Sequence, residues 1–373
     1  MTSPSPTSSA PGPGAQAPLT VADVAELAAR RLPADVLDFV NGGSGDESVQ
    51  AANRAALDGV RLIPRVLVGT DEASTSGRLV RSAAGMPLAV APMAYQRLLH
   101  PEGELAAARA ARAVDVPFVV STLSSYSVEE IAAVGGTVWF QLYWLRDRDA
   151  VLDLVCRAEK AGCEALVVTV DVPLMGRRLR DVRNGFSLPP QVTAANLGPA
   201  PDTAAHRRED GRSAVATHTA QAFDPALSWE DLAWLRERTS LPLLVKGVLD
   251  PRDAVRAVDA GADGVIVSNH GGRQFAAAVP SVTALPRVVE AVGGRCAVLL
   301  DSGVRTGADV LRALALGADG ALCGRPLLWG LAMDGEAGAR HVLELLRDEL
   351  RESLLLAGCP DLAAARRLEA VVV

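Results

Sequence analysis

Eight short apolar runs recur along the chain, and this repetition limits the possible folds more than any other feature. They cover residues 87–94, 116–122, 138–144, 165–172, 242–248, 264–270, 297–303 and 320–326. Most are separated by Ala-, Leu- and Arg-rich segments with helical periodicity, such as GELAAARAARAV. Strands that alternate with helices indicate βαβ units and a parallel sheet. Eight such units predict an α/β fold of the closed (β/α)8 TIM-barrel type. A doubly wound open sheet is the alternative, but it does not require so regular a count.

Three segments fall outside this repeat. The Pro-, Ser-, Gly- and Ala-rich residues 1–18 predict a disordered tail, and 19–373 a single domain with its barrel at about 86–335. Within 19–70 we expect two short helices followed by a Gly-rich turn, NGGSGDE. Residues 174–227, after the fourth strand, are far longer than a usual βα loop. An active-site lid is the preferred interpretation, and a tolerated surface insertion is the alternative.

Composition excludes several classes of function. The formal net charge is −7, so no basic surface for nucleic acid is indicated. No apolar run is long enough to span a membrane, and the N-terminus lacks the charged and apolar regions of a signal peptide. The five cysteines are scattered without CxxC spacing, which favours reduced thiols in a cytoplasmic protein. The five histidines lack metal-ligand spacing, so no metal site is expected.

The eleven residues GVIVSNHGGRQ, 264–274, carry the clearest chemical signal. A buried strand ends here in polar residues, and active sites of such barrels lie at the C-terminal ends of the strands. His270 can accept a proton near neutral pH, and Arg273 offers a fork of donors that fits a carboxylate. The pair suggests an enzyme that acts on a small organic acid. The alternative is a strand-to-loop turn with an ordinary histidine.

Two Gly- and Arg-containing loops, DSGVRTG and CGRP, follow the seventh and eighth strands. Phosphate groups often bind at these positions in such barrels, which predicts a phosphorylated cofactor or substrate. Lys246, at the end of the fifth strand, is either a Schiff-base nucleophile or a fixed positive charge, so pyridoxal-type and flavin cofactors are both possible. The flavin is favoured because His270 and Arg273 already form an acid-binding, proton-abstracting pair. No GxGxxG follows the first strand, which argues against a Rossmann nicotinamide site.

Together these motifs resemble those of the FMN-dependent α-hydroxy-acid oxidase and dehydrogenase family. The likeness rests on SNHGGRQ, LVKG, DSGVRTG and GRP, and on APMAYQRLLHPEGE, WFQLYWLRDRD and VTVDVPLMGRRLRDVRNGF. It covers roughly residues 20–365 and is greatest toward the hydroxymandelate oxidases.

The resemblance implies a role for each matching residue. His270 would be the catalytic base, Asp171 the carboxylate that supports its imidazolium, and Tyr143 the active-site tyrosine. Arg273 and Arg178 would bind the substrate carboxylate. Lys246 would lie against the flavin, with further FMN contacts from Pro92, Met93, Ala94, Ser121, Gln141, Thr169 and Ser268. The phosphate would be bound by Asp301, Ser302, Gly303, Arg305, Gly324 and Arg325.

The implied activity is oxidation of an aryl (S)-2-hydroxy acid, such as mandelate or 4-hydroxymandelate, to the 2-oxo acid, with O2 reduced to H2O2. The alternatives are an aliphatic acid of the lactate or glycolate type, a hydroxylated biosynthetic intermediate, or a non-catalytic flavin-binding role. The family also implies a homotetramer or homo-octamer.

The sequence departs from the family pattern at three places. Phe39 stands where many relatives place a carboxylate-binding Tyr, and Leu123 replaces an aromatic residue of glycolate oxidase. Both apolar side chains suit an aryl substrate, so Phe39 and Leu123 are expected to contact it. After SNHGGRQ, Phe275 and Ala276 replace the family's Leu and Asp.

Overall fold

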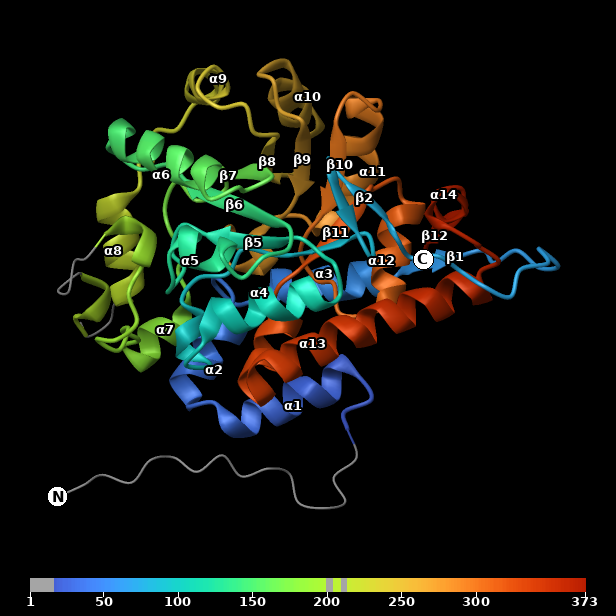
Figure 1. Ribbon diagram of the computed structural model, residues 1–373, viewed down its shortest axis with the longest axis horizontal. Helices are drawn as coiled ribbons and strands as arrows, with labels where there is room; N and C mark the ends of the chain where they lie inside the picture. Colours follow the sequence, from blue (N-terminus) through green and yellow to red (C-terminus); the bar gives the residue numbers. More distant parts are fainter. Residues whose placement is uncertain (1–16, 199–203, 209–212) are drawn as a thin grey trace.

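The computed structural model describes residues 17–198, 204–208 and 213–373, and its centre is a closed barrel of eight parallel strands (Figure 1). The strands neighbour one another in the order β10, β11, β4, β5, β6, β7, β8 and β9. Their bounds are β4 Leu88–Val90, β5 Phe118–Ser121, β6 Val138–Tyr143, β7 Ala165–Thr169, β8 Leu243–Val248, β9 Gly264–Val267, β10 Ala297–Leu300 and β11 Gly320–Cys323. The predicted (β/α)8 barrel is confirmed. The strands are mostly shorter than the predicted runs, and the polar residues that follow β9 and β10 lie beyond the strand ends.

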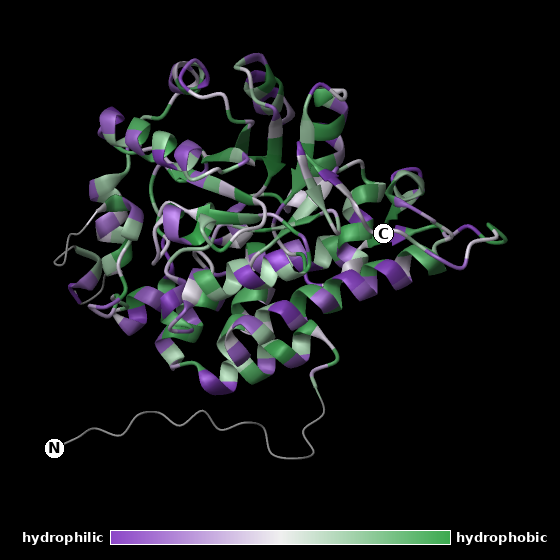
Figure 2. Cartoon of the chain, in the orientation of Figure 1, coloured by the Kyte–Doolittle hydropathy of each residue, from purple (hydrophilic) through white to green (hydrophobic). Residues whose placement is uncertain are grey.

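Helices surround the barrel and turn their apolar sides toward it (Figure 2). Their bounds are α4 Gly103–Ala113, α5 Val128–Ala132, α6 Arg148–Lys160, α9 Trp229–Arg236, α10 Pro251–Asp259, α11 Ser281–Val292, α12 Gly307–Ala315, α13 Arg325–Leu356 and α14 Leu362–Ala365. A break at Asp334 and Gly335, where the backbone angles are not helical, divides α13. Helix α13 also packs along α4 and α1 (Figure 1).

The N-terminal segment contains one helix more than the sequence indicated. Helices α1 (Val21–Arg31) and α2 (Ala34–Asn41) are the two predicted ones, and α3 (Ser48–Asp58) follows the Gly-rich turn. Strand β1 (Val60–Leu62) pairs antiparallel with β12 (Ala370–Val372), close to the C-terminus. The predicted disordered tail lies almost wholly outside the described residues, which begin at 17.

A hairpin closes the N-terminal end of the barrel. Strands β2 (Gly77–Leu79) and β3 (Ser82–Ala84) form it, and Leu79 packs with the apolar side chains of the barrel interior. The indole N–H of Trp139 donates to Ser82 Oγ at 3.0 Å. The interior is therefore filled at this end, and a ligand site can form only at the other.

The long segment after β7 forms several short helices beside the barrel (Figure 1). Those described are α7 Leu179–Asn184, η2 Ala195–Leu197, η3 Ala204–His206 and α8 Ala214–Ala222. Two further 3-10 turns lie elsewhere, η1 Gln96–Leu98 and η4 His270–Gly272. Met175, Val215 and Phe223 of the long segment line the main cavity, an arrangement that fits the lid interpretation.

No helix in the described part of the chain is long and apolar enough to cross a membrane. All five cysteines are free thiols.

Candidate active site

The strand alternation brings the predicted polar residues into the barrel. Eight apolar side chains, one from each strand region, fill the interior: Ala89, Val119, Trp139, Val167, Leu244, Ile266, Leu299 and Leu322. Side chains two positions apart on a strand point to the same side. The next inward positions are therefore Ala91, Ser121, Gln141, Thr169, Lys246, Ser268, Asp301 and Gly324. This layer forms the floor of a site at the C-terminal end of the barrel.

Above this layer lies a cavity with an empty volume of about 1190 Å³, including its open mouth. Most of the predicted site residues line it: Phe39, Pro92, Met93, Ala94, Ser121, Leu123, Tyr143, Arg178, Lys246, His270, Arg273, Asp301, Ser302, Gly303, Arg305, Gly324 and Arg325. Four do not: Gln141, Asp171, Thr169 and Ser268. Thr169 instead lines a smaller neighbouring cavity beside Tyr143.

His270 and Asp171 form a hydrogen-bonded pair at the edge of the cavity. His270 Nδ1 lies 2.9 Å from Asp171 Oδ1, which leaves Nε2 as the ring nitrogen able to accept a proton. The His270 backbone is left-handed (φ 58°), and its N–H donates to Ser268 Oγ at 3.0 Å. Burial lowers the pKa of His270 below its ordinary value, although the Asp171 carboxylate opposes the shift. A neutral imidazole is the form that can act as a base.

Asp171 remains ionised in this pair. Burial alone would raise the pKa of Asp171, but its interactions with His270 and Lys246 outweigh burial and lower it. Tyr143, from β6, keeps its proton because burial and then the Asp171 charge raise its pKa to about 12. The site therefore offers a base, an anion to support the base, and a hydroxyl donor.

Lys246 supplies a fixed positive charge on the floor of the cavity. Its Nζ lies 3.1 Å from both Ser268 Oγ and Asp301 Oδ2, and its side chain is almost fully buried. Burial would lower the pKa of Lys246, but Asp301 and Asp171 outweigh it and raise the pKa. A lysine held charged in this way is a poor amine nucleophile, so the arrangement favours a fixed charge over a Schiff base.

Three guanidinium groups lie on the side of the cavity next to α2, that of Arg178 buried and those of Arg273 and Arg325 partly buried. Arg273 donates to the carbonyl oxygens of Val40 (3.3 Å) and Gly42 (2.7 Å). Arg325 donates to the same two carbonyls and to that of Gly271. The Nε atom of Arg178 is buried with no hydrogen-bond partner among the described residues. Burial lowers the pKa of all three, that of Arg325 to about 9. None of the three forms an ion pair with a carboxylate among the described residues, and cations of this kind suit an anionic ligand.

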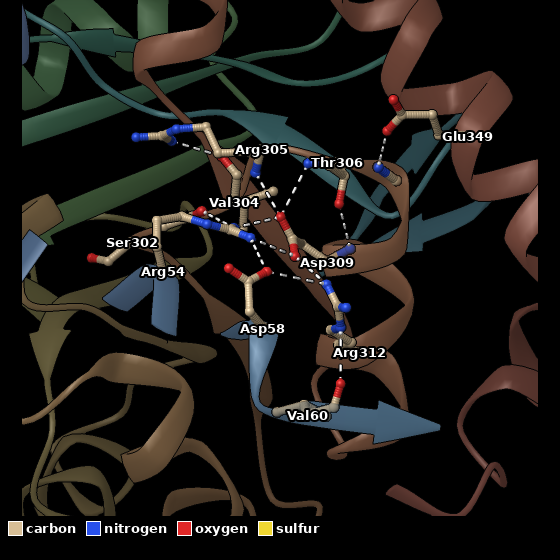
Figure 3. A network of polar contacts seen from close by, with 12 residues as sticks. Arg54, Asp58, Val60, Ser302, Val304, Arg305, Thr306, Asp309, Arg312 and Glu349 are labelled. Carbon is tan, nitrogen blue, oxygen red and sulfur yellow. Dashed lines mark hydrogen bonds and ion pairs between the residues drawn. The ribbon is translucent and has the colours of Figure 1, made fainter. Parts of the chain in front are cut away.

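The loop after β10 is braced from outside the barrel. Asp309 Oδ2 accepts the backbone N–H groups of Arg305 (2.9 Å) and Thr306 (3.1 Å), and Arg54 of α3 donates to the same oxygen at 2.7 Å. Arg54 also donates to the Gly303 carbonyl at 2.6 Å. Figure 3 shows the Arg305 side chain extending away from this network. Its guanidinium makes only one hydrogen bond among the described residues, to the Val304 carbonyl at 2.8 Å.

Comparison with known proteins decides the family. The sequence profile of the FMN-dependent dehydrogenases matches residues 28–370. The chain belongs to the FMN-dependent dehydrogenase family. It is 57% identical over 350 residues to 4-hydroxymandelate oxidase of Amycolatopsis orientalis, covering 94% of this chain and 97% of the relative. It is 44% identical to L-lactate oxidase of Nostoc sp., covering 92% and 96%. A crystal structure of mandelate oxidase with (S)-4-hydroxymandelic acid superposes with a TM-score of 0.93 at 56% identity, covering 95% of this chain and 99% of that one.

The residues around the cavity fit FMN, the cofactor of this family. Gln141 Nε2 is buried without a hydrogen-bond partner among the described residues, whereas its Oε1 accepts from Ser121 Oγ at 3.2 Å. Lys246 brings a positive charge, as the electron-rich end of a reduced flavin requires. Arg305 is a partly buried cation whose guanidinium makes one hydrogen bond among the described residues, to the Val304 carbonyl. Arg305 and Arg325 both line the cavity, and their role in binding the phosphate stays a prediction.

The three departures from the family pattern lie in different places. Phe39 is buried in the cavity wall and stacks on Phe186 with ring centroids 4.6 Å apart. The guanidinium carbons of Arg178 and Arg273 lie 5.9 and 5.5 Å from the Phe39 ring centroid. Leu123 is also buried in the wall.

The replacement at Phe275 and Ala276 lies outside the cavity. Phe275 is 70% exposed. Ala276 lies against Gly45, so closely that a Cβ atom on that glycine would come within 2.8 Å of the Ala276 methyl group. The change from Asp to Ala therefore concerns packing against the turn before α3.

Arg54 and Asp309 were missed by the sequence reasoning, although they hold the loop predicted to bind phosphate. One signal was available: Thr306 and Asp309 form a capping box at the start of α12, and their spacing in TGAD is typical of one. Nothing in the sequence pointed to Arg54, because α3 was not predicted.

Proposed function

We propose that this protein oxidises an aryl (S)-2-hydroxy acid, of the mandelate or 4-hydroxymandelate type, to the corresponding 2-oxo acid. The overall reaction converts one hydroxy acid and one O2 to one oxo acid and one H2O2. FMN supplies the acceptor for the two electrons that leave the α-carbon.

The residues of the chain bind the acid and move its proton. Arg178 and Arg273 would hold the substrate carboxylate, and the Tyr143 hydroxyl would donate to the carboxylate or the α-hydroxyl. His270 Nε2 would accept a proton from the substrate as electrons leave it. Asp171, bonded to the opposite ring nitrogen at 2.9 Å, would stabilise the imidazolium that forms. Lys246, charged on the cavity floor, would stabilise negative charge on the reduced cofactor.

The observation that carries the proposal is the meeting of two unlike surfaces in one cavity. One is a base flanked by buried cations, which suits a hydroxy acid. The other is an apolar wall that includes Phe39, Leu123 and Phe223, which suits an aromatic ring. The identity to 4-hydroxymandelate oxidase of Amycolatopsis orientalis supports the same substrate class.

An aliphatic 2-hydroxy acid is the second candidate. The identity of 44% to L-lactate oxidase of Nostoc sp. favours it, since the base and the arginines would serve either substrate. The apolar wall separates the two candidates, because a lactate methyl group would leave most of it without a partner.

Anaerobic mixing of the FMN-loaded protein with mandelate, lactate and glycolate tests the proposal. Mandelate should bleach the flavin absorbance fastest, and oxygen uptake with H2O2 release should follow when air is admitted. Faster reduction by lactate would establish the aliphatic alternative, and reduction by no hydroxy acid would indicate a non-catalytic flavin-binding role.

The remaining expectations complete the proposal. Residues 19–373 would form one domain, working as a cytoplasmic homotetramer or homo-octamer without nucleic-acid or membrane partners. Absence of a candidate membrane helix among the described residues is compatible with this. Light scattering of the purified protein would measure the assembly.

A further inference from the structure

One face of the lid helix forms part of the apolar cavity wall. Val215, Thr219 and Phe223 follow one another at intervals of four residues along α8 and its end, and all three line the cavity. Residues four apart lie on the same side of a helix. The Phe223 N–H still donates to the Thr219 carbonyl at 2.9 Å, so the helical spacing persists to Phe223.

One end of this face lies beside Tyr143, one of the proposed reacting groups. The Phe223 ring stacks on Tyr143, with centroids 4.6 Å apart and an interplanar angle of 26°. Thr219 lies one turn of α8 further along the wall, a rise of about 6 Å. The carboxylate of an aryl 2-hydroxy acid is expected at Arg178 and Arg273, so its ring would extend along this wall.

Thr219 is a hydroxyl-bearing residue of this wall, which also includes the apolar side chains of Leu123, Met175 and Val215. The residue is only 4% exposed. Its Oγ1 lies 3.0 Å from the Ala216 carbonyl and 3.7 Å from Met175 Sδ, and both of these atoms are acceptors. The one hydroxyl proton is therefore used within the lid, and the lone pairs of Oγ1 accept from no group in the described residues.

We propose that Thr219 is a specificity-determining residue, whose Oγ1 accepts a hydrogen bond from a hydroxyl group at the para position of the substrate ring. This inference rests on the proposed function. A phenolic hydroxyl is a good donor, and the proton of Thr219 is already used, so the site selects a ring substituent that can donate. A site built to pair with a substrate hydroxyl discriminates against analogues that lack it.

Substitution of Thr219 tests the inference. Thr219→Val keeps the shape of the side chain and removes the oxygen, whereas Thr219→Ser keeps the oxygen. The measurement is the ratio of kcat/KM for 4-hydroxymandelate to that for mandelate, with 4-fluoromandelate as a para substituent that cannot donate. Loss of one neutral hydrogen bond predicts that Thr219→Val lowers the ratio roughly 3- to 10-fold, while Thr219→Ser retains it. In the wild type, 4-fluoromandelate should behave like mandelate.

The matched control is Thr217→Val, on the same helix. The Thr217 hydroxyl faces the Ser213 carbonyl at 3.5 Å, and the residue does not line the cavity. This variant should leave the ratio unchanged. Calorimetric binding of 4-hydroxybenzoylformate and benzoylformate gives a readout that does not depend on turnover, and Thr219→Val should lower their affinity ratio by the same factor.

The outcomes separate the two proposals. One outcome is that the wild type oxidises both aryl acids while Thr219→Val shows the same kcat/KM ratio for 4-hydroxymandelate over mandelate as the wild type. This result would overturn the role of Thr219 and leave the proposed function intact. A wild type that is reduced by lactate but by neither aryl acid would overturn the proposed function itself. A ratio that falls equally in Thr217→Val and Thr219→Val would also overturn the inference, because it would indicate a general distortion of α8.

Discussion

The floor and the wall of the cavity are built in different ways. The floor comes from strand ends, where Lys246, Ser268 and Asp301 lie within 3.1 Å of one another and each polar group has a partner. The wall comes from the N-terminal helices and the lid, and includes Phe39 and Phe223. Phe39 lies near Arg178, whose Nε atom has no hydrogen-bond partner among the described residues. These three floor residues are already bonded to one another, whereas Gln141 Nε2 on the floor and Arg178 Nε in the wall have no hydrogen-bond partner among the described residues.

This difference suggests that the floor and the wall have different functions. The strand ends provide the chemistry shared by the family, and the segments outside the repeat provide the choice of acid. Substitutions on the floor should therefore lower turnover for every substrate, while substitutions in the wall should change affinity or preference. The predictions below test this division, beginning with the largest effect.

Replacement of the base should have the largest effect. His270→Gln removes the proton acceptor but keeps a side chain of similar length, so flavin reduction by mandelate should slow by roughly 10²- to 10⁴-fold. Bound FMN should remain, as its absorbance would show. Stopped-flow reduction under anaerobic conditions measures the rate. His341→Gln, outside the cavity, is the matched control, and near-normal reduction in His270→Gln would exclude the proposed role of the base.

Removal of an unpaired cation from the wall should mainly weaken binding. Arg178→Met keeps the length of the side chain and loses the charge, which predicts an increase in KM of roughly 10- to 100-fold, as for a lost hydrogen bond to a charged group. The exposed Arg183, on the same helix α7, gives the control Arg183→Met. If kcat fell while KM stayed unchanged, Arg178 would act in the chemical step, as the floor residues are proposed to do.

The pH dependence should report His270 and its carboxylate partner. Burial lowers the pKa of His270 from 6.5, so kcat/KM should be constant near neutral pH. Below the lowered pKa the base becomes protonated, and kcat/KM should fall about tenfold per pH unit. Asp171 raises the pKa of His270, so Asp171→Asn should move the acidic limb to lower pH and also lower the plateau, because the imidazolium loses its counter-ion. A limb that moves to higher pH in Asp171→Asn would contradict this coupling.

The floor could be predicted from the sequence because its pattern is local. Each barrel strand alternates inward and outward residues, so the position of Lys246 or Asp301 follows once the eight runs are recognised. The roles assigned to His270 and Arg273 came from one short motif and from the resemblance to a family. In the structure both side chains line the cavity.

The contacts that brace the site from outside the barrel could not be predicted to the same degree, because they join segments far apart in the chain. Helix α3 has few large apolar residues, so its periodicity was weak, and its Arg54 bonds to Asp309 more than 250 positions away. The donation of Arg325 to the Val40 and Gly42 carbonyls depends equally on tertiary structure. No motif marked Thr219 either, since a threonine within a helix most often only bonds its own backbone.

Phe39 offers the smallest and most selective test of this division. Phe39→Tyr adds one hydroxyl group to a ring that lies under Arg178 and Arg273, where many relatives place a tyrosine for the carboxylate. A further hydrogen bond to a small acid should favour lactate, while an aryl ring would meet a polar atom in its apolar wall. The mandelate-to-lactate ratio of kcat/KM should therefore fall roughly 3- to 10-fold, the effect of one hydrogen bond. Phe275→Tyr, at an exposed position outside the cavity, should leave the ratio unchanged. An equal loss of turnover with both acids in Phe39→Tyr would mean that this position governs the shared chemistry, and the proposed separation between floor and wall would be wrong there.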